Sequence, residues 1–207
     1  GAGGAPLTLL PEGSSWKYLA DGSDEGMAWR APGYNDASWD SGPGQLGYGD
    51  NDEDTDVGFV ETGGDKNATT YFRTTFNVAD ASAITGLTLN LTYDDGAAIY
   101  LNGVEVGKTS NMASDMAFDA YTVGGDDSPG DDAQEAFTIS SAQLVTGSNT
   151  LAVEIKQGDG SSSDISFDLE VIGQTAGSGS DPGDFTLTAN AAGQSDSVSM
   201  VSLGVTP

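Results

Sequence analysis

The segment from residue 69 to residue 108 constrains the fold most, because its apolar side chains recur at every second position. Polar residues separate these apolar positions, which are Phe72, Phe76, Leu87, Leu89 and Leu91. A period of two places alternate side chains on opposite faces of a β-strand. The dipeptide Asn102-Gly103 follows a further strand-like run, and Asn-Gly is a strong signal for a two-residue hairpin turn. The segment therefore predicts antiparallel strands.

Two later segments, residues 151–155 and 165–171, repeat the same alternation. Each is apolar on one face and polar on the other, which is typical of a sheet with one face in water. Two such sheets close a core when their apolar faces pack together. We therefore predict an all-β, antiparallel β-sandwich. Its core should contain Phe72, Phe76, Leu87, Leu89, Leu91, Ile99, Leu101, Leu151, Val153, Ile155, Phe167 and Leu169.

The density of strand and turn signals divides the chain into four parts. Residues 1–13 are small and flexible in composition and predict an N-terminal extension. Residues 14–172 carry the strands of the sandwich, and residues 173–184 are a Gly/Ser/Asp linker. Residues 185–207 alternate again and predict an extra C-terminal pair of strands. An isolated hairpin is marginal in water, so this pair needs its own domain or a neighbouring copy to cover it.

The charge of the chain limits its partners. Acidic residues outnumber basic residues by 32 to 6, which gives a formal charge of −26 in 207 residues. Such a field repels nucleic acid and anionic membrane surfaces, and it suits divalent cations or a salty medium. No apolar run is long enough to cross a bilayer. These features predict a secreted or cell-surface protein of a saline environment that binds no nucleic acid and does not insert into a membrane.

The chain has no cysteine and no histidine. Disulfides, thiolate metal sites, cysteine nucleophiles and imidazole catalysis are therefore excluded. A carboxylate pair remains available for glycoside hydrolysis, but acids are too abundant here for their proximity to be informative. We expect a protein that is not an enzyme and needs no cofactor other than calcium.

Motifs in order along residues 14–172 resemble a known group of domains. They are Ser15–Tyr18, Ala28–Arg30, Tyr34–Trp39, Leu46–Gly49, Tyr71–Phe76, Asp94–Ala97, Ile99–Gly103 and Asn149–Glu154. The chain resembles galactose-binding-domain-like jelly rolls, and it is similar to the sugar-binding domain of family 2 glycosidases and to accessory modules of secreted bacterial proteins. The resemblance implies a jelly-roll sandwich without implying a ligand, because many members bind no sugar. It also implies that the three tryptophans are framework residues.

Aromatic residues crowd the first third of the chain and indicate a carbohydrate site. Sugars stack on exposed rings and accept or donate hydrogen bonds through their hydroxyls. We expect Tyr34 and Tyr48 to supply exposed rings, with Asp36 and Arg30 nearby for the hydroxyl groups. The alternative is that these rings pack over one end of the sandwich.

An acidic loop indicates a calcium site. Acids recur at alternate positions at Asp50, Asp52, Asp54 and Asp56, and Glu61 follows eleven residues after the first of them. Calcium takes six to eight hard oxygen ligands. The glycine that an EF-hand loop needs at its sixth position is absent, so the spacing predicts an irregular calcium site; a solvated acidic surface is the alternative.

Two further sites match the sequon for N-glycosylation, at Asn67 and Asn90. Asn90 falls on the polar face of its predicted strand, where a glycan would not disturb the core.

Two functions remain open from the sequence. The chain is predicted to be a non-catalytic extracellular module that binds carbohydrate or acts in adhesion, stabilised by calcium. The alternative is a structural subunit of an extracellular filament or surface layer, which assembles by strand addition through residues 185–207.

Overall fold

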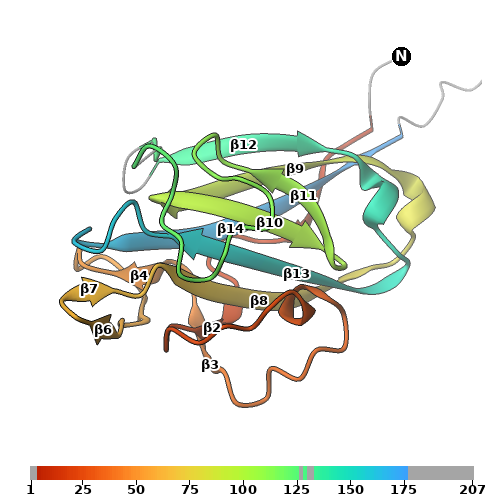
Figure 1. Cartoon of the computed structure of the whole chain (residues 1–207). Coiled ribbons are helices and arrows are strands. Elements are labelled where there is room, and N and C mark those ends of the chain that lie inside the picture. The colour runs from red at the N-terminus through yellow and green to blue at the C-terminus, as the bar shows by residue number, and fades with distance from the viewer. Residues whose placement is uncertain (1–3, 126–127, 130–132, 177–207) are drawn as a thin grey trace, which may run out of the picture.

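The computed structural model describes residues 4–125, 128–129 and 133–176 as a sandwich of two β-sheets (Figure 1). No α-helix occurs in these residues, and three short 3-10 helices connect strands: η1 (Ala28–Arg30), η2 (Ala81–Ala83) and η3 (Ser141–Gln143). The predicted all-β antiparallel sandwich is confirmed.

The first sheet, called sheet A, has the strand order β12-β9-β14-β4-β5, and β1 also pairs with β14. Apart from the short parallel pair of β4 and β5, its strands are antiparallel. Its strands are β1 (Leu7–Leu10), β4 (Leu46–Tyr48), β5 (Thr55–Asp56), β9 (Ile84–Asp94), β12 (Gln134–Ile139) and β14 (Ile165–Thr175).

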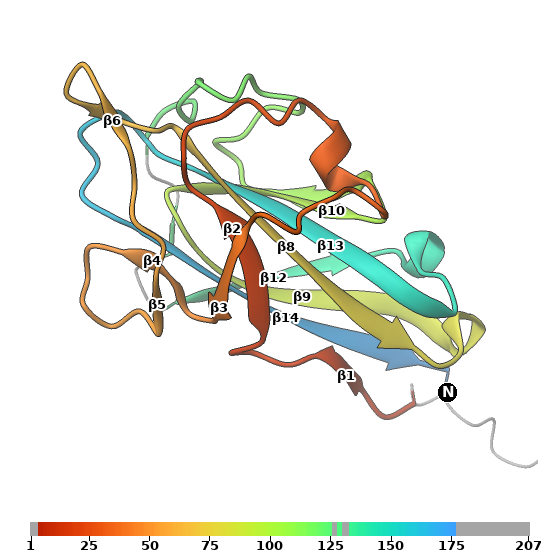
Figure 2. The same cartoon turned by 90° about the horizontal axis from the view of Figure 1, so that it is seen from below.

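The second sheet, called sheet B, has the order β11-β10-β13-β8-β2-β3 and is antiparallel throughout. Its strands are β2 (Ser15–Leu19), β3 (Asp40–Pro43), β8 (Thr69–Val78), β10 (Gly96–Leu101), β11 (Val104–Lys108) and β13 (Gly147–Lys156). A small hairpin of β6 (Glu61–Thr62) and β7 (Asp65–Lys66) precedes β8. Figure 2 shows β2, β8 and β13 of sheet B in front of β9, β12 and β14 of sheet A.

The predicted hairpin turn at Asn102-Gly103 joins β10 to β11, where Leu101 pairs with Val104. Both turn residues have positive φ, 51° and 88°. This is the conformation of a type I′ turn, which Asn and Gly adopt with little strain and whose twist matches that of the strands.

The core lies between the two sheets and is apolar. All twelve side chains predicted for it are buried there. Trp16, at 1% exposure, is part of the same core and packs edge-on against Phe167. Burial of such side chains is the main favourable contribution to folding.

The outer face of sheet B is not in water, which corrects the expectation of a wet polar face. On β13, Ala152, Glu154 and Lys156 point away from the core, and all three are buried. Residues 20–39 and 109–122 lie over this face. Side chains from these segments and from sheet B form a second buried cluster, whose members are Trp29, Trp39, Tyr71, Ala98, Tyr100, Met112 and Ala152. The tryptophans are therefore framework residues, as the resemblance implies.

The N-terminal segment and the end of the sandwich also differ from the predicted boundaries. Residues 4–13 of the predicted extension do not stand apart, because β1 within them pairs with β14. Strand β14 continues to Thr175, three residues beyond the predicted end, because Thr175 pairs with Ile84 of β9. The predicted linker after residue 176 and the strands of residues 185–207 lie outside the described residues.

Candidate functional site

A groove follows the outer face of sheet B between its two covering segments. One part is a cavity of about 290 Å³, and the other is a cavity of about 340 Å³. Both are lined by Phe118 and Asp119, so the two cavities lie side by side. Ligand sites usually have volumes of about 300–1,000 Å³. The groove is therefore large enough for a small organic ligand or a short oligomer.

Residues of β8 and β13 form the floor of the groove. They are Thr69 and Tyr71 from β8 and Glu154 from β13. The walls come from residues 21–30 on one side and residues 115–121 on the other, while β7 and the residues around it close one end. Phe118 and Tyr121 are half-buried, so part of each ring faces solvent beside the groove.

Arg30 connects the groove to the charged layer beneath it. Its Nη1 donates to Asp115 Oδ1 at 2.6 Å, and its Nη2 lies 3.7 Å from Glu154 Oε1. The guanidinium group also stacks on Tyr100, 4.2 Å from the ring centroid. Cation–π stacking and ion pairing together hold this side chain in one place. Arg30 is thus a structural cation of the groove wall as well as a lining residue.

Glu154 is the most deeply buried acid of the groove. Its exposure is 3%, and Oε1 accepts a hydrogen bond of 2.8 Å from the hydroxyl group of Tyr100. Burial raises the pKa of this carboxyl group, although Lys156, Tyr100 and Arg30 act in the opposite direction. Lys156 is fully buried below the groove and donates to Thr69 Oγ1 and to the carbonyl oxygen of Ala117. Burial lowers its pKa to about 8.

The four predicted sugar-binding residues do not lie together. Arg30 lines the groove. Asp36 is bound to Arg73 Nε and to Lys17 Nζ, both at 2.9 Å. Burial would raise its pKa, but these two cations outweigh burial and lower it. Asp36 therefore holds the covering segment on sheet B rather than lining the groove.

The two predicted tyrosines also lie outside the groove lining. Tyr34 is half-buried against Trp39, and its hydroxyl group donates to Glu25, which raises the pKa of Tyr34 to about 12. Tyr48 was expected to be exposed, and this expectation is wrong because its exposure is 6%. Its ring packs on Phe59, and its hydroxyl group is bound to Gln157.

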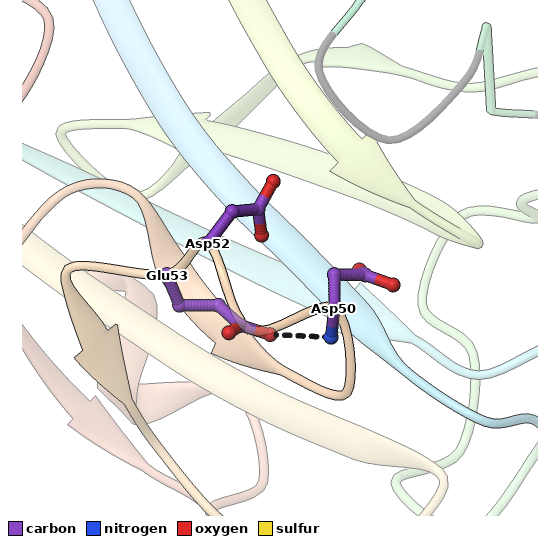
Figure 3. Close-up of side chains that lie close together, drawn as sticks. All are labelled: Asp50, Asp52 and Glu53. Atoms are coloured by element: carbon purple, nitrogen blue, oxygen red, sulfur yellow. Dashed lines mark hydrogen bonds between the residues drawn. The ribbon is translucent and has the colours of Figure 1, made fainter.

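The acidic loop between β4 and β5 gathers part of the predicted calcium set. Carboxylate oxygens of Asp50, Asp52 and Glu53 lie within 4.8 Å of one another (Figure 3). Glu53 also accepts hydrogen bonds from the backbone N–H groups of Asp50 and Asn51, each 3.1 Å long. Three carboxylates supply oxygens of the kind that calcium takes.

The other predicted calcium ligands lie outside this group. Asp54 and Asp56 are exposed, and Asp56 accepts a hydrogen bond from Gly58 N within its own turn. Glu61 is exposed on β6. Sequence spacing missed Glu53, because the turn at Asn51, with φ of 68°, brings consecutive residues of the loop together.

Both sequon asparagines use their side-chain amides in hydrogen bonds. Asn67 Nδ2 donates to the carbonyl oxygen of Thr69 at 2.8 Å, and Asn90 Nδ2 donates to Glu170 Oε2 at 2.8 Å. Asn67 lines the groove, whereas Asn90 lies on the outer face of sheet A, as expected.

Sequence reasoning missed most of the groove residues. Phe118, Asp119 and Tyr121 belong to a connection without periodicity, and nothing in the sequence shows which strand it covers. Arg73 and Lys156 lie on strands, but so do Lys17, Lys66 and Lys108, so a basic residue on a strand gave no usable signal for the buried layer.

Comparisons with known proteins bear on the fold. No protein-family model and no curated protein sequence matches this chain. Among solved structures, the chain is similar to the β-glucuronidase of Ruminococcus gnavus in complex with D-glucuronic acid, with 13% identity and a TM-score of 0.52. The apo structure of that enzyme gives a TM-score of 0.51 at the same identity.

The aligned region covers 82% of this chain and 29% of each β-glucuronidase chain. The chain therefore corresponds to less than a third of the length of these enzymes. At this identity the likeness shows the fold alone. The resemblance to the jelly-roll domain of a glycosidase is confirmed at that level.

Proposed function

We propose that this chain is a non-catalytic β-sandwich module that binds carbohydrate in the groove on the outer face of sheet B. The observation that carries the proposal is the combination of half-buried rings and carboxylates in one groove. Rings accept the apolar face of a sugar, and carboxylates accept hydrogen bonds from its hydroxyl groups. The correspondence to part of a glycosidase, rather than to the whole enzyme, is consistent with an accessory role.

Titration calorimetry with a panel of oligosaccharides tests this function. Phe118→Ala removes a ring shared by both cavities and should weaken binding at least about tenfold, which is about 1.4 kcal/mol. Phe137→Ala is the matched control, because Phe137 is a half-buried phenylalanine on β12 of sheet A. The proposal fails if no glycan in the panel binds, or if the two substitutions weaken binding equally.

We also propose that calcium stabilises the loop through Asp50, Asp52 and Glu53. The proximity of their carboxylate oxygens supports this role. An ion that binds the folded chain better than the unfolded chain raises the melting temperature. Asp50→Asn combined with Asp52→Asn should abolish a calcium-dependent rise in melting temperature. Asp54→Asn with Asp56→Asn makes the same change in charge outside the cluster and should preserve it; equal loss in both variants would contradict the site.

The alternative function is a filament subunit built by strand addition. Within the described residues, β12 is an edge of sheet A, and β11 and β3 are the edges of sheet B. Such edges can pair with another strand. Light scattering of the full chain and of a chain lacking residues 177–207 tests this alternative, because the deletion spares β14. Assemblies that disappear on deletion would favour the filament, whereas a monomer in both cases would favour the carbohydrate module.

An extracellular or cell-surface location in a saline environment completes the proposal. Its support is the formal charge of −26, which repels itself at low ionic strength. The described residues contain no helix that is long and apolar enough to cross a membrane. If salt tolerance explains the acidity, sodium chloride at about 1 M should raise the melting temperature, since the Debye length then falls to about 3 Å.

A further inference from the structure

The acids of the groove outnumber the cations available to them. All six basic residues of the chain lie in the described part, and each already contacts protein oxygens. Their ion pairs go to Asp36, Asp115, Glu154 and Glu105. Further carboxylates line the groove outside these ion pairs: Asp21, Asp24, Asp65 and Asp119. The groove thus has an excess of negative charge.

The cations nearest to the groove are directed to other partners. Lys66 donates to the carbonyl oxygens of Ser162 and Ser163 and lies over the ring of Phe59. Lys156 is buried under the floor, where it donates to Thr69 Oγ1 and to the carbonyl oxygen of Ala117 and offsets part of the charge of Glu154 and Asp119. Arg30 faces two carboxylates, Asp115 and Glu154, at once. An anionic ligand would therefore meet more carboxylates than cations, and each of these cations already has protein partners.

The negative charge of the groove includes a buried carboxylate on its floor, that of Glu154. Its carboxylate is buried, its hydrogen bond from Tyr100 and its ion pair with Arg30 are both to Oε1, and Lys156 acts on it electrostatically. A buried carboxylate with one hydrogen bond and a partner at 3.7 Å gains from an additional donor. A ligand that donates hydrogen bonds and carries positive charge would supply it.

The arrangement suits an organic cation rather than a metal ion. Among the described residues, the acids close enough together to hold a metal are Asp50, Asp52 and Glu53, which do not line the groove. The groove acids are spread along its length, and the half-buried side chains of Met116 and Phe118 line it beside them. A metal ion would leave the exposed parts of these two apolar side chains uncovered, whereas a sugar ring would cover them.

We propose that the groove is selective for amino sugars with a free, protonated amine, such as the glucosamine units of a deacetylated aminopolysaccharide. This inference rests on the proposed carbohydrate-binding function and specifies its ligand. The ammonium group lies among Asp24, Asp119 and Glu154, and the apolar face of the sugar ring lies on Phe118. Uronic acids are excluded by like-charge repulsion, and N-acetylated sugars lack the cation.

Titration calorimetry at about pH 6, on the acidic side of the pKa range of amines, tests the selectivity. The probes are hexamers of glucosamine, N-acetylglucosamine, glucose and galacturonic acid. The glucosamine hexamer should bind at least about tenfold more tightly than either neutral hexamer, and the galacturonic acid hexamer should not bind. The preference should decrease as salt is added.

A charge-matched pair of variants separates a site from the general acidity of the surface. Asp24→Asn with Asp119→Asn should reduce the preference for glucosamine at least about tenfold. Asp40→Asn with Asp54→Asn changes the charge equally at exposed positions outside the groove and should leave the preference unchanged. Equal losses in both variants would overturn the inference, as would a hexalysine peptide that binds as tightly as the glucosamine hexamer.

The failure of this inference can be told from that of the proposed function. If neutral hexamers bind as tightly as the glucosamine hexamer, the selectivity is wrong and the carbohydrate function stands. If no hexamer binds, both are wrong.

Discussion

The two faces of β8 show how differently one strand is used. On the inner face, Phe72 and Phe76 lie in an apolar core, with Phe72 stacked 4.3 Å from Phe167. On the outer face, Tyr71 and Arg73 are equally buried but lie beneath the covering segments among charged groups. Burial is therefore the same on both faces, while the forces that stabilise them differ.

The inner face is stabilised by the burial of apolar surface area, and the outer face by specific hydrogen bonds and ion pairs. Apolar contacts are non-directional, so the core tolerates small shifts at modest cost. Arg73 instead donates to Asp36 at 2.9 Å, to the carbonyl oxygen of Ala31 at 3.3 Å and to that of Trp29. Each of these bonds has a fixed direction, so the outer layer holds the covering segments in one position. That is the property a binding groove needs.

The largest expected effect comes from the inner core. Phe167 is fully buried between Trp16 and Phe72, so Phe167→Ala should lower the free energy of unfolding by about 3–5 kcal/mol. Urea denaturation measures it. Phe137→Ala, at a half-buried position, should cost less. A loss below about 1 kcal/mol for Phe167→Ala would mean that the two sheets are not packed as described.

The outer layer should respond to the loss of a donor rather than of volume. Arg73→Met keeps much of the side-chain length but leaves Asp36 and two carbonyl oxygens without this partner, so it should cost about 2–3 kcal/mol. Adding Asp36→Asn should cost little more, because the two residues form one network. Strict additivity in urea denaturation would show that Asp36 and Arg73 are not coupled.

A pH effect of intermediate size is expected from the outer layer, where Lys156 lies buried. Burial lowers the pKa of Lys156 from 10.5 to about 8. Between these values the unfolded chain binds more protons than the folded chain, so this lysine makes stability increase with pH. The destabilisation is fully present below about pH 8 and is relieved toward the unfolded pKa.

Melting curves between about pH 8 and pH 9.5, below the range where tyrosines ionise, measure this slope. Lys156→Met should remove it, whereas Lys108→Met, on a partly exposed lysine, should retain it. The same slope in all three proteins would show that Lys156 is not desolvated.

The smallest effect is expected at an ion pair on the surface that belongs neither to the inner core nor to the buried outer layer. Lys108 Nζ lies 2.8 Å from Glu105 Oε1. The side chain of Lys108 is 33% exposed and that of Glu105 is 26% exposed. Exposed pairs contribute about 0.2–1 kcal/mol, so Lys108→Ala should change the free energy of unfolding by about 0.5 kcal/mol or less. An effect as large as that of Arg73→Met would show that this exposed ion pair stabilises the fold as much as the buried pair of Arg73 and Asp36 does.

The inner core could be predicted from the sequence because it depends on a local pattern. The period of two in residues 87–91 determines which leucines face inward, and a neighbouring sheet must then cover them. The turn at Asn102-Gly103 was predictable for the same reason, since its conformation depends on two adjacent residues.

The outer layer and the groove could not be predicted in this way. Glu154 and Lys156 alternate with apolar residues just as solvent-facing residues do, and the sequence pattern is the same whether water or a loop covers them. Their burial depends on residues 20–39 and 109–122, which are distant in sequence and lack periodicity. The exposure expected for Tyr48 was wrong for a similar reason, because Phe59 and Gln157 cover it from separate segments.

The pairing of β1 with β14 determines how the domain would carry a mechanical load. Leu7 lies opposite Gly173, and Gly4 N donates to the carbonyl oxygen of Thr175 at 3.0 Å, so the chain enters and leaves side by side. Tension applied through residues 4 and 176 would open this antiparallel ladder one hydrogen bond at a time, as a zipper opens, rather than shear it. The cavity of the groove that β7 lines lies toward the other end of the sandwich, near β6 and β7 (Figure 1). A pulled molecule should therefore release β1 first, while this cavity remains folded.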